Sequence, residues 1–383
     1  MDQYVYPLGE LRPSEWGEVL NYWSRDYVAA VANFHLVIDK LQESGFEISH
    51  DRLMIDQKGP QDEQLGIDIV MIGSSDSSKW LLSSSGVHGV EGFAGSAIQL
   101  SILEQLENVP EDTALVFVHI INPYGMAWLR RVNESNVDLN RNMLLPGESY
   151  SGEPAGYAAL SPILNDESPP KKRDGFLRKA AWIVLKNGWN NTKQAIAEGQ
   201  FERPKCMQFG GEQMETSLVL LLGWLEKNIS NVKRCVWIDL HTGLGKAGVD
   251  SLLVEFSPGD PKLKLLKQHY GKRITSLDPN GGIAYKIRGG IQAGVEARFP
   301  QIEWTSITQE FGTVGLLSVI SALRAENRWT QWGGATERDA MNHWSRDKLL
   351  STFRLNKSSW EKNLIDRGRK LFHTAIGDLT REG

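Results

Sequence analysis

The feature of this sequence that most limits its fold is the alternation of short apolar runs with longer helical segments. The runs have strand length and are bounded by residues that favour turns. They lie at 66–72, 79–83, 114–121, 235–240, 252–256 and 304–311. Apolar residues recur at helical spacing in other segments, at 93–106, 212–229, 316–325 and 360–379. This alternation predicts an α/β fold with a mixed, largely parallel central sheet covered by helices on both faces. The first two runs are close enough to form a hairpin.

Helices also flank this core at both ends of the chain. Apolar residues at steps of three and four predict an N-terminal helix over 14–44. Ser14 is its expected N-cap and Gly45 its expected stop. The C-terminal helices fall within 316–383.

Residues 144–210 differ from the rest of the chain. They contain many Gly, Ser, Asn and Pro residues around one helical stretch near 177–185, so we interpret them as a long insertion. At roughly 150 residues per domain, the length of the chain would allow two domains. No shift in composition marks a boundary, and we therefore predict one domain over 1–383.

The composition excludes several classes of protein. A hydrophobic share of 41% excludes a disordered chain, and a net charge of -5 without a basic cluster argues against nucleic-acid binding. The most apolar run, 218–225, is far shorter than the roughly 20 residues of a membrane-spanning helix. The first residues do not resemble a secretory signal, so a cytoplasmic location is expected. Cys206 and Cys235, interpreted as reduced thiols, are too few for a disulfide framework or a Cys-rich zinc module.

A pair of possible metal ligands follows the run 79–83. His88 and Glu91 have the spacing HxxE between a predicted strand and a predicted helix. Imidazole and carboxylate are ligand types that zinc accepts, and ligands gather at the carboxyl ends of parallel strands. Gly86, Gly89 and Gly92 would let the backbone wrap closely around an ion. The pair alone favours the simpler interpretation, a solvated His beside a Glu.

A third ligand is needed, because a catalytic zinc has three protein ligands and an open position for water. His241 follows the buried run 235–240 directly, before a loop that contains glycine. A structural histidine is the alternative interpretation. The placement of both His88 and His241 at strand ends favours metal binding. The remaining histidines have no comparable spacing partners and are interpreted as surface or core residues: His35, His50, His119, His269, His343 and His373.

Further charged side chains are expected at the same edge of the sheet. Arg131, Asn140 and Arg141 form a cluster suited to binding a carboxylate, although an ordinary solvated loop would look the same. Glu310 ends an apolar run, where a carboxylate is costly unless it faces water, a cation or a reacting group, or forms a salt bridge. A serine nucleophile at Ser96 is disfavoured, because GFAGS lacks the GxSxG spacing and lies in a predicted helix.

Four motifs, in this order along the chain, resemble those of the zinc metallocarboxypeptidases: HGVEG, VDLNRN, IDLHTG and TQEFGT. The longer segments GVHGVEGFAGSAIQ and NPYGMAWLRRVNESNVDLNRN resemble an uncharacterised, mostly bacterial branch of this family. The resemblance covers roughly residues 65–325.

The resemblance implies a role for each matching residue. His88, Glu91 and His241 would bind one zinc ion, and Asp138 would orient the first histidine. Glu310 would act as general base and acid. Asn140 and Arg141 would hold the terminal carboxylate of the substrate. Arg131 would stabilise the oxyanion, with Arg130 as a competing assignment. The substrate-side tyrosine of the family has no clear counterpart here, and Tyr285, in a Gly-rich stretch, is the residue that we match to it.

The implied activity is hydrolysis of an amide bond next to a free carboxylate by a zinc-activated water. Such an enzyme is a metallocarboxypeptidase acting on peptides or, alternatively, a deacylase of small N-acyl amino acids. A protein that retains zinc and binds peptides without cleaving them is a further alternative. The implied partner is the substrate, a peptide or a small acylated amino acid, and the sequence does not define the oligomeric state.

Overall fold

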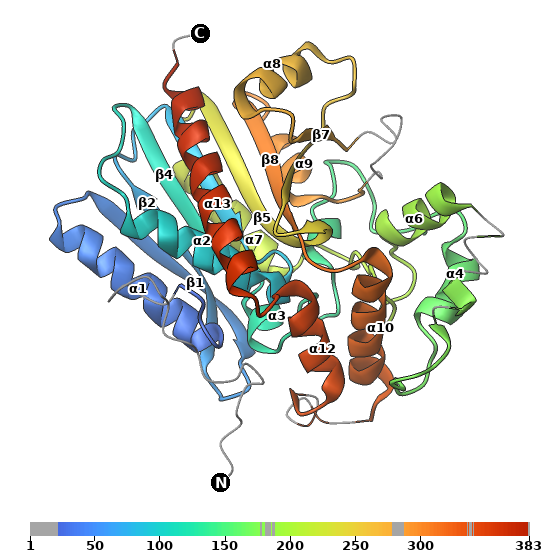
Figure 1. Ribbon diagram of the computed structural model, residues 1–383. Helices are drawn as coiled ribbons and strands as arrows, with labels where there is room; N and C mark the ends of the chain where they lie inside the picture. The colour runs from blue at the N-terminus through green and yellow to red at the C-terminus, as the bar shows by residue number, and fades with distance from the viewer. Residues whose placement is uncertain are drawn as a thin grey trace.

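The computed structural model describes residues 22–381 except 177, 181–184, 186–187, 278–286, 335, 337–338 and 340. In this part of the chain, eight strands form one sheet with the order β1-β2-β4-β3-β5-β8-β6-β7 (Figure 1). The strands are β1 (Ile48–Lys58), β2 (Gln64–Ile72), β3 (Lys79–Ser85), β4 (Thr113–His119), β5 (Arg234–Ala247), β6 (Asp250–Val254), β7 (Ile274–Ser276) and β8 (Glu303–Gly312). The α-helices are α1 (Tyr27–Glu43), α2 (Gly92–Glu104), α3 (Pro123–Ala127), α4 (Tyr157–Leu164), α6 (Trp189–Ala197), α7 (Thr216–Asn228), α8 (Pro261–Tyr270), α9 (Ile291–Glu296), α10 (Leu316–Trp332), α12 (Trp344–Phe353) and α13 (Ser358–Leu379). Two 3-10 turns, η1 (Gly89–Glu91) and η2 (Leu139–Arg141), complete the described elements.

The centre of the sheet is parallel, and antiparallel pairs join it to its margins, where β7 in turn pairs in parallel with β6. β4, β3, β5 and β8 pair with one another in parallel, in that order. β1 and β2 add an antiparallel hairpin on one side, and β6 joins β8 antiparallel on the other. The predicted mixed, largely parallel α/β fold is confirmed.

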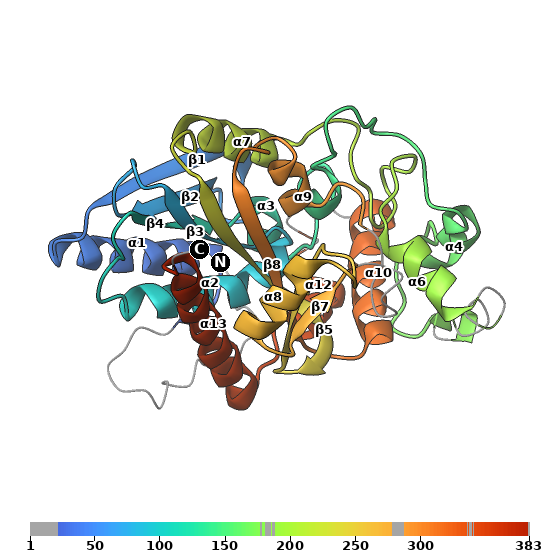
Figure 2. The ribbon, with the colours of Figure 1, turned by 90° about the horizontal axis from the view of Figure 1, so that it is seen from above.

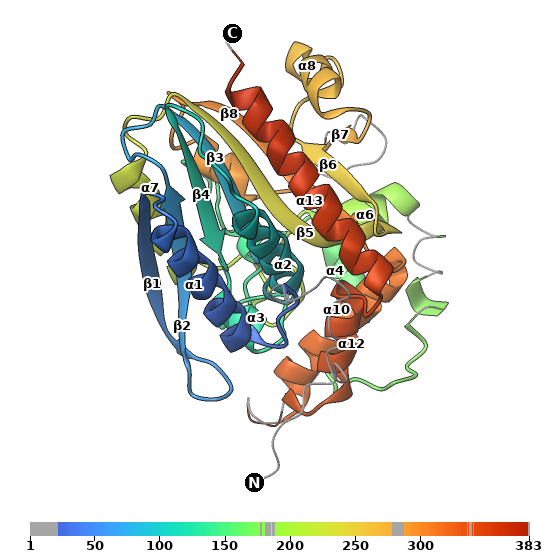
Figure 3. The ribbon, with the colours of Figure 1, turned by 60° about the vertical axis from the view of Figure 1, so that its left-hand side comes forward.

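Helices cover both faces of the sheet because successive strand residues point to opposite sides. In β4, Leu115 and Phe117 pack in one core cluster with α1, α2 and α13, whereas Val116 and Val118 pack in another with α7 and α9. Figures 2 and 3 show these two helical layers on either side of the strands. Among the described helices, none combines the length and the apolar character that spanning a bilayer requires.

The predicted start of the N-terminal helix needs correction. The described part of the first helix begins at Tyr27, and Asp26 caps it by accepting a hydrogen bond from the backbone N–H of Ala29, so residues 22–26 are not helical. Ser14 lies outside the described residues. The helix ends one residue before Ser44, and Gly45 has the positive φ of a helix stop, as predicted.

The predicted hairpin between the first two runs is wrong, because β4 lies between β2 and β3. The hairpin partner of β2 is β1, which the sequence reading missed. β1 is an edge strand with mostly exposed or half-exposed side chains, and its sequence therefore lacks the apolar run that marks a buried strand.

The segment 144–210 contains α4 and α6, which lie beside α10 (Figure 1). The predicted helical stretch at 177–185 lies largely outside the described residues. Two buried arginines of α10 fasten this segment: Arg324 Nε donates to the carbonyl of Ile163 at 2.6 Å, and Arg328 Nη1 donates to Asp174 Oδ2 at 2.9 Å. The segment is therefore held against the C-terminal helices.

Candidate active site

Three neighbouring parallel strands carry the predicted metal and acid–base residues. His88 lies three residues after β3, and Glu91 closes the turn η1 that leads into α2. His241 and Glu310 lie within β5 and β8, which run past the predicted strand ends, and they are direct partners in the parallel register. Because β3, β5 and β8 are neighbours in the sheet, His88 and Glu310 come together although they are more than 200 positions apart in the chain.

His88, Glu91 and His241 converge in a buried cluster. Nδ1 of His88 lies 2.9 Å from Glu91 Oε1, and Nδ1 of His241 lies 3.2 Å from Glu91 Oε2. One ligand atom from each residue lies within 4.8 Å of the others. The two imidazole rings meet edge to face, with centroids 4.9 Å apart.

The other nitrogen of each imidazole faces a second carboxylate. Nε2 of His88 lies 3.1 Å from Asp138 Oδ1, and Nε2 of His241 lies 2.7 Å from Asp239 Oδ2. Asp239 is itself fixed by a hydrogen bond from Ser84 Oγ at 2.6 Å. A carboxylate on the outer nitrogen orients a metal-binding histidine and raises its basicity. Both rings therefore present Nδ1 inward.

This donor set fits a zinc ion. Two imidazole nitrogens and a carboxylate are a ligand combination that catalytic zinc sites use. Nδ1 of His88 is buried and has no hydrogen-bond partner, although Glu91 is close to it. Its lone pair is therefore available to coordinate a metal ion. Burial lowers the pKa of His241, but Asp239 and Glu91 outweigh burial and raise that pKa well above its usual value. The site stabilises positive charge.

The structure separates the two candidate arginines. Arg131 lies at the cluster: its Nη1 donates to Glu91 Oε1 at 3.0 Å and its Nε donates to Asp138 Oδ2 at 3.2 Å. Arg130 points elsewhere, and its Nε donates to Glu326 Oε1 at 2.9 Å in a buried ion cluster. Only the side chain of Arg131, of these two, lines the cavity beside the metal ligands.

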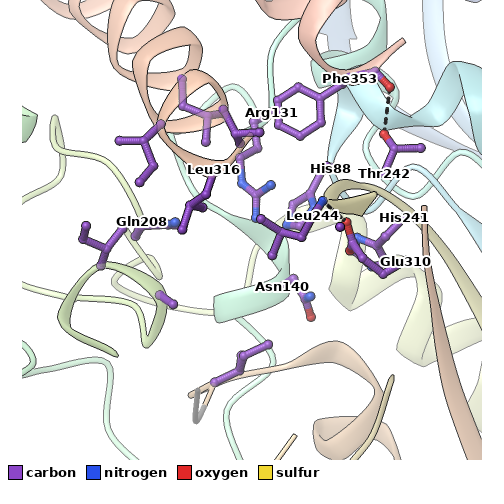
Figure 4. A pocket seen from close by; sticks show the side chains of 18 of the residues that line it. His88, Arg131, Asn140, Gln208, His241, Thr242, Leu244, Glu310, Leu316 and Phe353 are labelled. Carbon is purple, nitrogen blue, oxygen red and sulfur yellow. Dashed lines mark hydrogen bonds between the residues drawn. The ribbon is translucent and has the colours of Figure 1, made fainter. Parts of the chain in front are cut away.

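Glu310 faces the cluster from β8 (Figure 4). Its Oε1 accepts a hydrogen bond from the backbone N–H of Leu244 at 2.7 Å, which fixes the carboxyl group. Burial, together with the nearby Glu91 carboxylate, raises the pKa of Glu310 to about 7. A group with this pKa can both accept and deliver a proton near neutral pH.

The two predicted carboxylate-binding residues lie together in the turn η2, and both line the cavity. Asn140 Oδ1 accepts a hydrogen bond from the backbone N–H of Ile291 at 3.1 Å. Arg141 Nε donates to the carbonyl of Ala197 at the end of α6, at 2.9 Å. Its guanidinium is thereby held in a fixed orientation. Tyr285 lies outside the described residues.

Gly89, next to His88, lies where the ligand turn packs closely against other backbone. A Cβ on Gly89 would lie 2.0 Å from the carbonyl carbon of Gly125. Gly89 and Val90 also donate backbone hydrogen bonds to the carbonyls of Arg131 and Arg130, at 3.1 and 2.8 Å. Gly89 therefore allows the ligand turn to pack directly on α3 and on the arginine pair.

A cavity of about 360 Å³ opens from the cluster. Its floor carries the metal-site residues with Arg131, Asn140 and Arg141, while α4, α6 and α10 supply much of its wall. Figure 4 shows Leu316 and Phe353 beside the polar floor. The apolar wall includes Leu160, Ile163, Leu164, Ile196, Val319 and Ile320.

A family model matches residues 23–367, nearly the whole chain. The chain belongs to the DUF2817 family. The description of this family is a protein of unknown function. A comparison with curated proteins gave no match.

Solved structures similar to this DUF2817 protein have low sequence identity to it. Carboxypeptidase A from Helicoverpa armigera is 12% identical with a TM-score of 0.46, over 84% of this chain and 73% of that chain. Bovine thrombin-activatable fibrinolysis inhibitor is 10% identical with a TM-score of 0.44, over 90% and 99% of the two chains. Murein-tripeptide amidase from Escherichia coli O157 is 13% identical with a TM-score of 0.35, over 76% and 96%.

Two features of the DUF2817 site were missed by sequence reasoning. Asp239 lies two positions before His241 in β5, and residues two apart in a strand share a face, so the DLH triplet contained the necessary signal. The backbone N–H of Leu244, which fixes Glu310, left no signal in the sequence. Ser96 lies in α2 as predicted and is fully buried beside His119, away from the cavity.

Proposed function

We propose that this protein is a zinc-dependent hydrolase that cleaves an amide bond next to a free carboxylate, as a metallocarboxypeptidase acting on peptides. One observation carries the proposal: His88, Glu91 and His241 converge on one point opposite a Glu310 carboxyl group whose pKa is about 7. A carboxyl group with a raised pKa that faces such a cluster inside a cavity is a candidate for proton transfer.

Each residue has a role in this proposal. A zinc ion at the cluster supplies Lewis acidity and lowers the pKa of water towards ~7. Glu310 accepts a proton from the attacking water and delivers it to the leaving amine. Arg131 is anchored by the hydrogen bond from its Nε to Asp138, and its Nη1 lies beside Glu91. There the guanidinium would stabilise the negative charge that develops on the carbonyl oxygen of the substrate.

Substrate orientation is assigned to the opposite side of the floor. Asn140 and Arg141 hold the free carboxylate, and the bond between Arg141 and the carbonyl of Ala197 fixes the direction of the guanidinium. Because Ala197 belongs to α6, the segment 144–210 helps to position the carboxylate as well as forming the wall.

A deacylase of N-acyl amino acids is the second candidate function, because the apolar wall of the cavity suits an acyl chain as well as a side chain. The two reactions share the amide and the adjacent carboxylate. They differ in whether the apolar group lies on the acyl side or on the amino-acid side of the bond.

Metal content and turnover test the proposal together. We expect the purified protein to hold zinc at the His88 cluster and to hydrolyse members of a panel of N-blocked dipeptides and N-acyl amino acids. A chelator should remove the activity and added zinc should restore it. Cleavage only of acyl amino acids would favour the deacylase. Zinc-loaded protein inert to the whole panel would favour a binding protein, and activity in metal-free protein would overturn the zinc assignment.

The apolar wall predicts a preference for large apolar substrates. Burying one methylene contributes about 0.8 kcal/mol, so each methylene added to the group that enters the cavity should raise kcat/KM about fourfold until the cavity is filled. A series from alanine-sized to leucine-sized groups, in both the side-chain and the acyl position, measures this slope. The steeper of the two series identifies the group that occupies the cavity, and two flat series would contradict the prediction.

A further inference from the structure

A second cluster of histidines and a carboxylate lies at the edge of the sheet, on α1, β1 and β2. Nε2 of His35 and Nε2 of His50 lie 2.8 and 2.9 Å from the same oxygen, Oδ1 of Asp68. One ligand atom from each of the three residues lies within 4.8 Å of the others. In Figures 1 and 3, these elements lie at the end of the molecule opposite α4, α6 and α10, so the cluster is separate from the cavity.

The fold brings these residues together through strand register and helix packing. Arg52 of β1 is the direct partner of Asp68 in β2, and His50 lies two residues before Arg52 on the same face, diagonal to Asp68. His35 comes from α1, whose buried neighbour Phe34 packs in the core beneath. Tyr27, at the start of α1, donates from its hydroxyl to the carbonyl of Gly66 at 2.9 Å and fixes the helix over β2.

The geometry of this cluster matches that of the proposed active-site cluster. The rings of His35 and His50 meet edge to face at 66° with centroids 5.0 Å apart, against 71° and 4.9 Å for His88 and His241. In both clusters one carboxylate lies between two imidazole nitrogens, through the single oxygen Oδ1 of Asp68 in one and through both oxygens of Glu91 in the other. The same three ligand types thus converge twice in one chain.

The surroundings of Asp68 leave one side of the cluster open. The Asp68 side chain is fully buried, whereas those of His35 and His50 are 37% and 26% exposed. Arg52 Nη1 donates to the other oxygen, Oδ2, at 2.6 Å, and Arg52 Nη2 donates to the Tyr27 hydroxyl at 3.2 Å. Arg52 therefore orients the carboxylate without occupying Oδ1, which faces the histidines.

We propose that His35, His50 and Asp68 form a second binding site for a divalent transition-metal ion such as zinc. The three side chains would supply three ligands, and water would complete the coordination from the exposed side. Because the ligands come from α1, β1 and β2, a bound ion would link the first described helix to the edge hairpin. This second site is independent of the cavity and of the reaction proposed there.

Zinc stoichiometry tests the proposal directly. Wild-type protein dialysed against buffered zinc should hold one more equivalent than the His50→Gln and His35→Gln variants. His35 is the more exposed of the two, so its replacement disturbs the core least. The His88→Gln variant should lose one equivalent from the other cluster, and the His50→Gln, His88→Gln double variant should lose both.

A matched control is available at His269. Its Nδ1 lies 2.8 Å from Asp378 Oδ1 and its side chain is 21% exposed, but in the described chain no second histidine joins this pair as a metal ligand. The His269→Gln variant should keep the full wild-type stoichiometry.

Thermal unfolding provides an independent readout, because an ion that binds only the folded state stabilises it. Added zinc should raise the Tm of the His88→Gln variant by a few degrees, and the further His50→Gln change should abolish that rise. The proposal is overturned if both His35→Gln and His50→Gln retain the stoichiometry of the wild type. It is also overturned if zinc does not raise the Tm of His88→Gln. Loss of zinc from only the His88 variants would support the proposed active site and refute this second site.

Discussion

The Glu310→Gln protein should keep its zinc and lose about 10²–10⁴-fold in kcat, the range that a positioned acid–base group contributes. Glutamine has the size of glutamate, and its carbonyl oxygen can still accept the hydrogen bond from the backbone N–H of Leu244. The substitution therefore removes proton transfer and leaves the position of the side chain unchanged. Single-turnover rates on the best substrate of the panel, with zinc measured on the same samples, check the prediction.

The control for this variant is Glu296→Gln. Glu296, at the end of α9, is a half-buried glutamate whose pKa is also raised by burial, but it does not line the cavity. Its replacement should leave kcat within a small factor of the wild-type value. A Glu310→Gln protein as active as Glu296→Gln would remove Glu310 from the mechanism, and loss of zinc from Glu310→Gln would show that it acts by holding the metal.

The parts of the fold that were predictable are those in which a strand is buried on both faces. β4 is apolar from Ala114 to Val118 because each of these residues meets one of two helical layers, and such a run is visible in sequence. β1 shows the opposite case. Its exposed residues are polar except Met54, so the strand is set by pairing with β2, and pairing between strands leaves little trace in one sequence.

The same distinction applies to the sites. His88 and Glu91 are three residues apart on one turn, and a local pattern reveals them. His35, His50 and Asp68 are 15 and 18 positions apart on three elements, so no spacing rule joins them before the hairpin and α1 are in place.

Arg130 and Arg131 show a further limit of prediction from sequence. Their order in the chain does not reveal which one turns into the cavity, and Glu326, nearly 200 positions later, binds Arg130.

The Glu326→Ala substitution should lower the free energy of unfolding by about 3–5 kcal/mol, the cost of breaking a buried ion pair from one side. Glu326 Oε1 lies 2.9 Å from Arg130 Nε and 3.0 Å from Arg346 Nη1, and all three side chains are at most 3% exposed. Removing the carboxylate leaves two buried guanidinium groups without their counter-charge. Urea denaturation at neutral pH measures the loss.

The matched control is an exposed pair on α13. Lys362 and Asp366 lie 2.7 Å apart with both side chains 49% exposed, so Lys362→Ala should change the free energy of unfolding by no more than about 0.5 kcal/mol. If Glu326→Ala costs no more than this control, the cluster does not hold the C-terminal helices to the Arg130 segment.

The pH dependence of the Glu326 effect separates loss of charge from loss of packing. Burial raises the pKa of Glu326, but Arg130 and Arg346 outweigh it and lower the pKa below its usual value. A carboxyl group with a lowered folded-state pKa stabilises the fold fully above its unfolded pKa of about 4.3, and this contribution is lost as the pH falls through the folded value. The difference between wild type and Glu326→Ala should therefore be constant from about pH 5 upward and shrink below about pH 4. A difference that stays the same at low pH would mean that the side chain acts through its volume.

The loss of the Glu326 charge should also weaken zinc binding at the His88 cluster. The reason is that the carbonyls of Arg130 and Arg131 accept hydrogen bonds from the turn that carries Glu91.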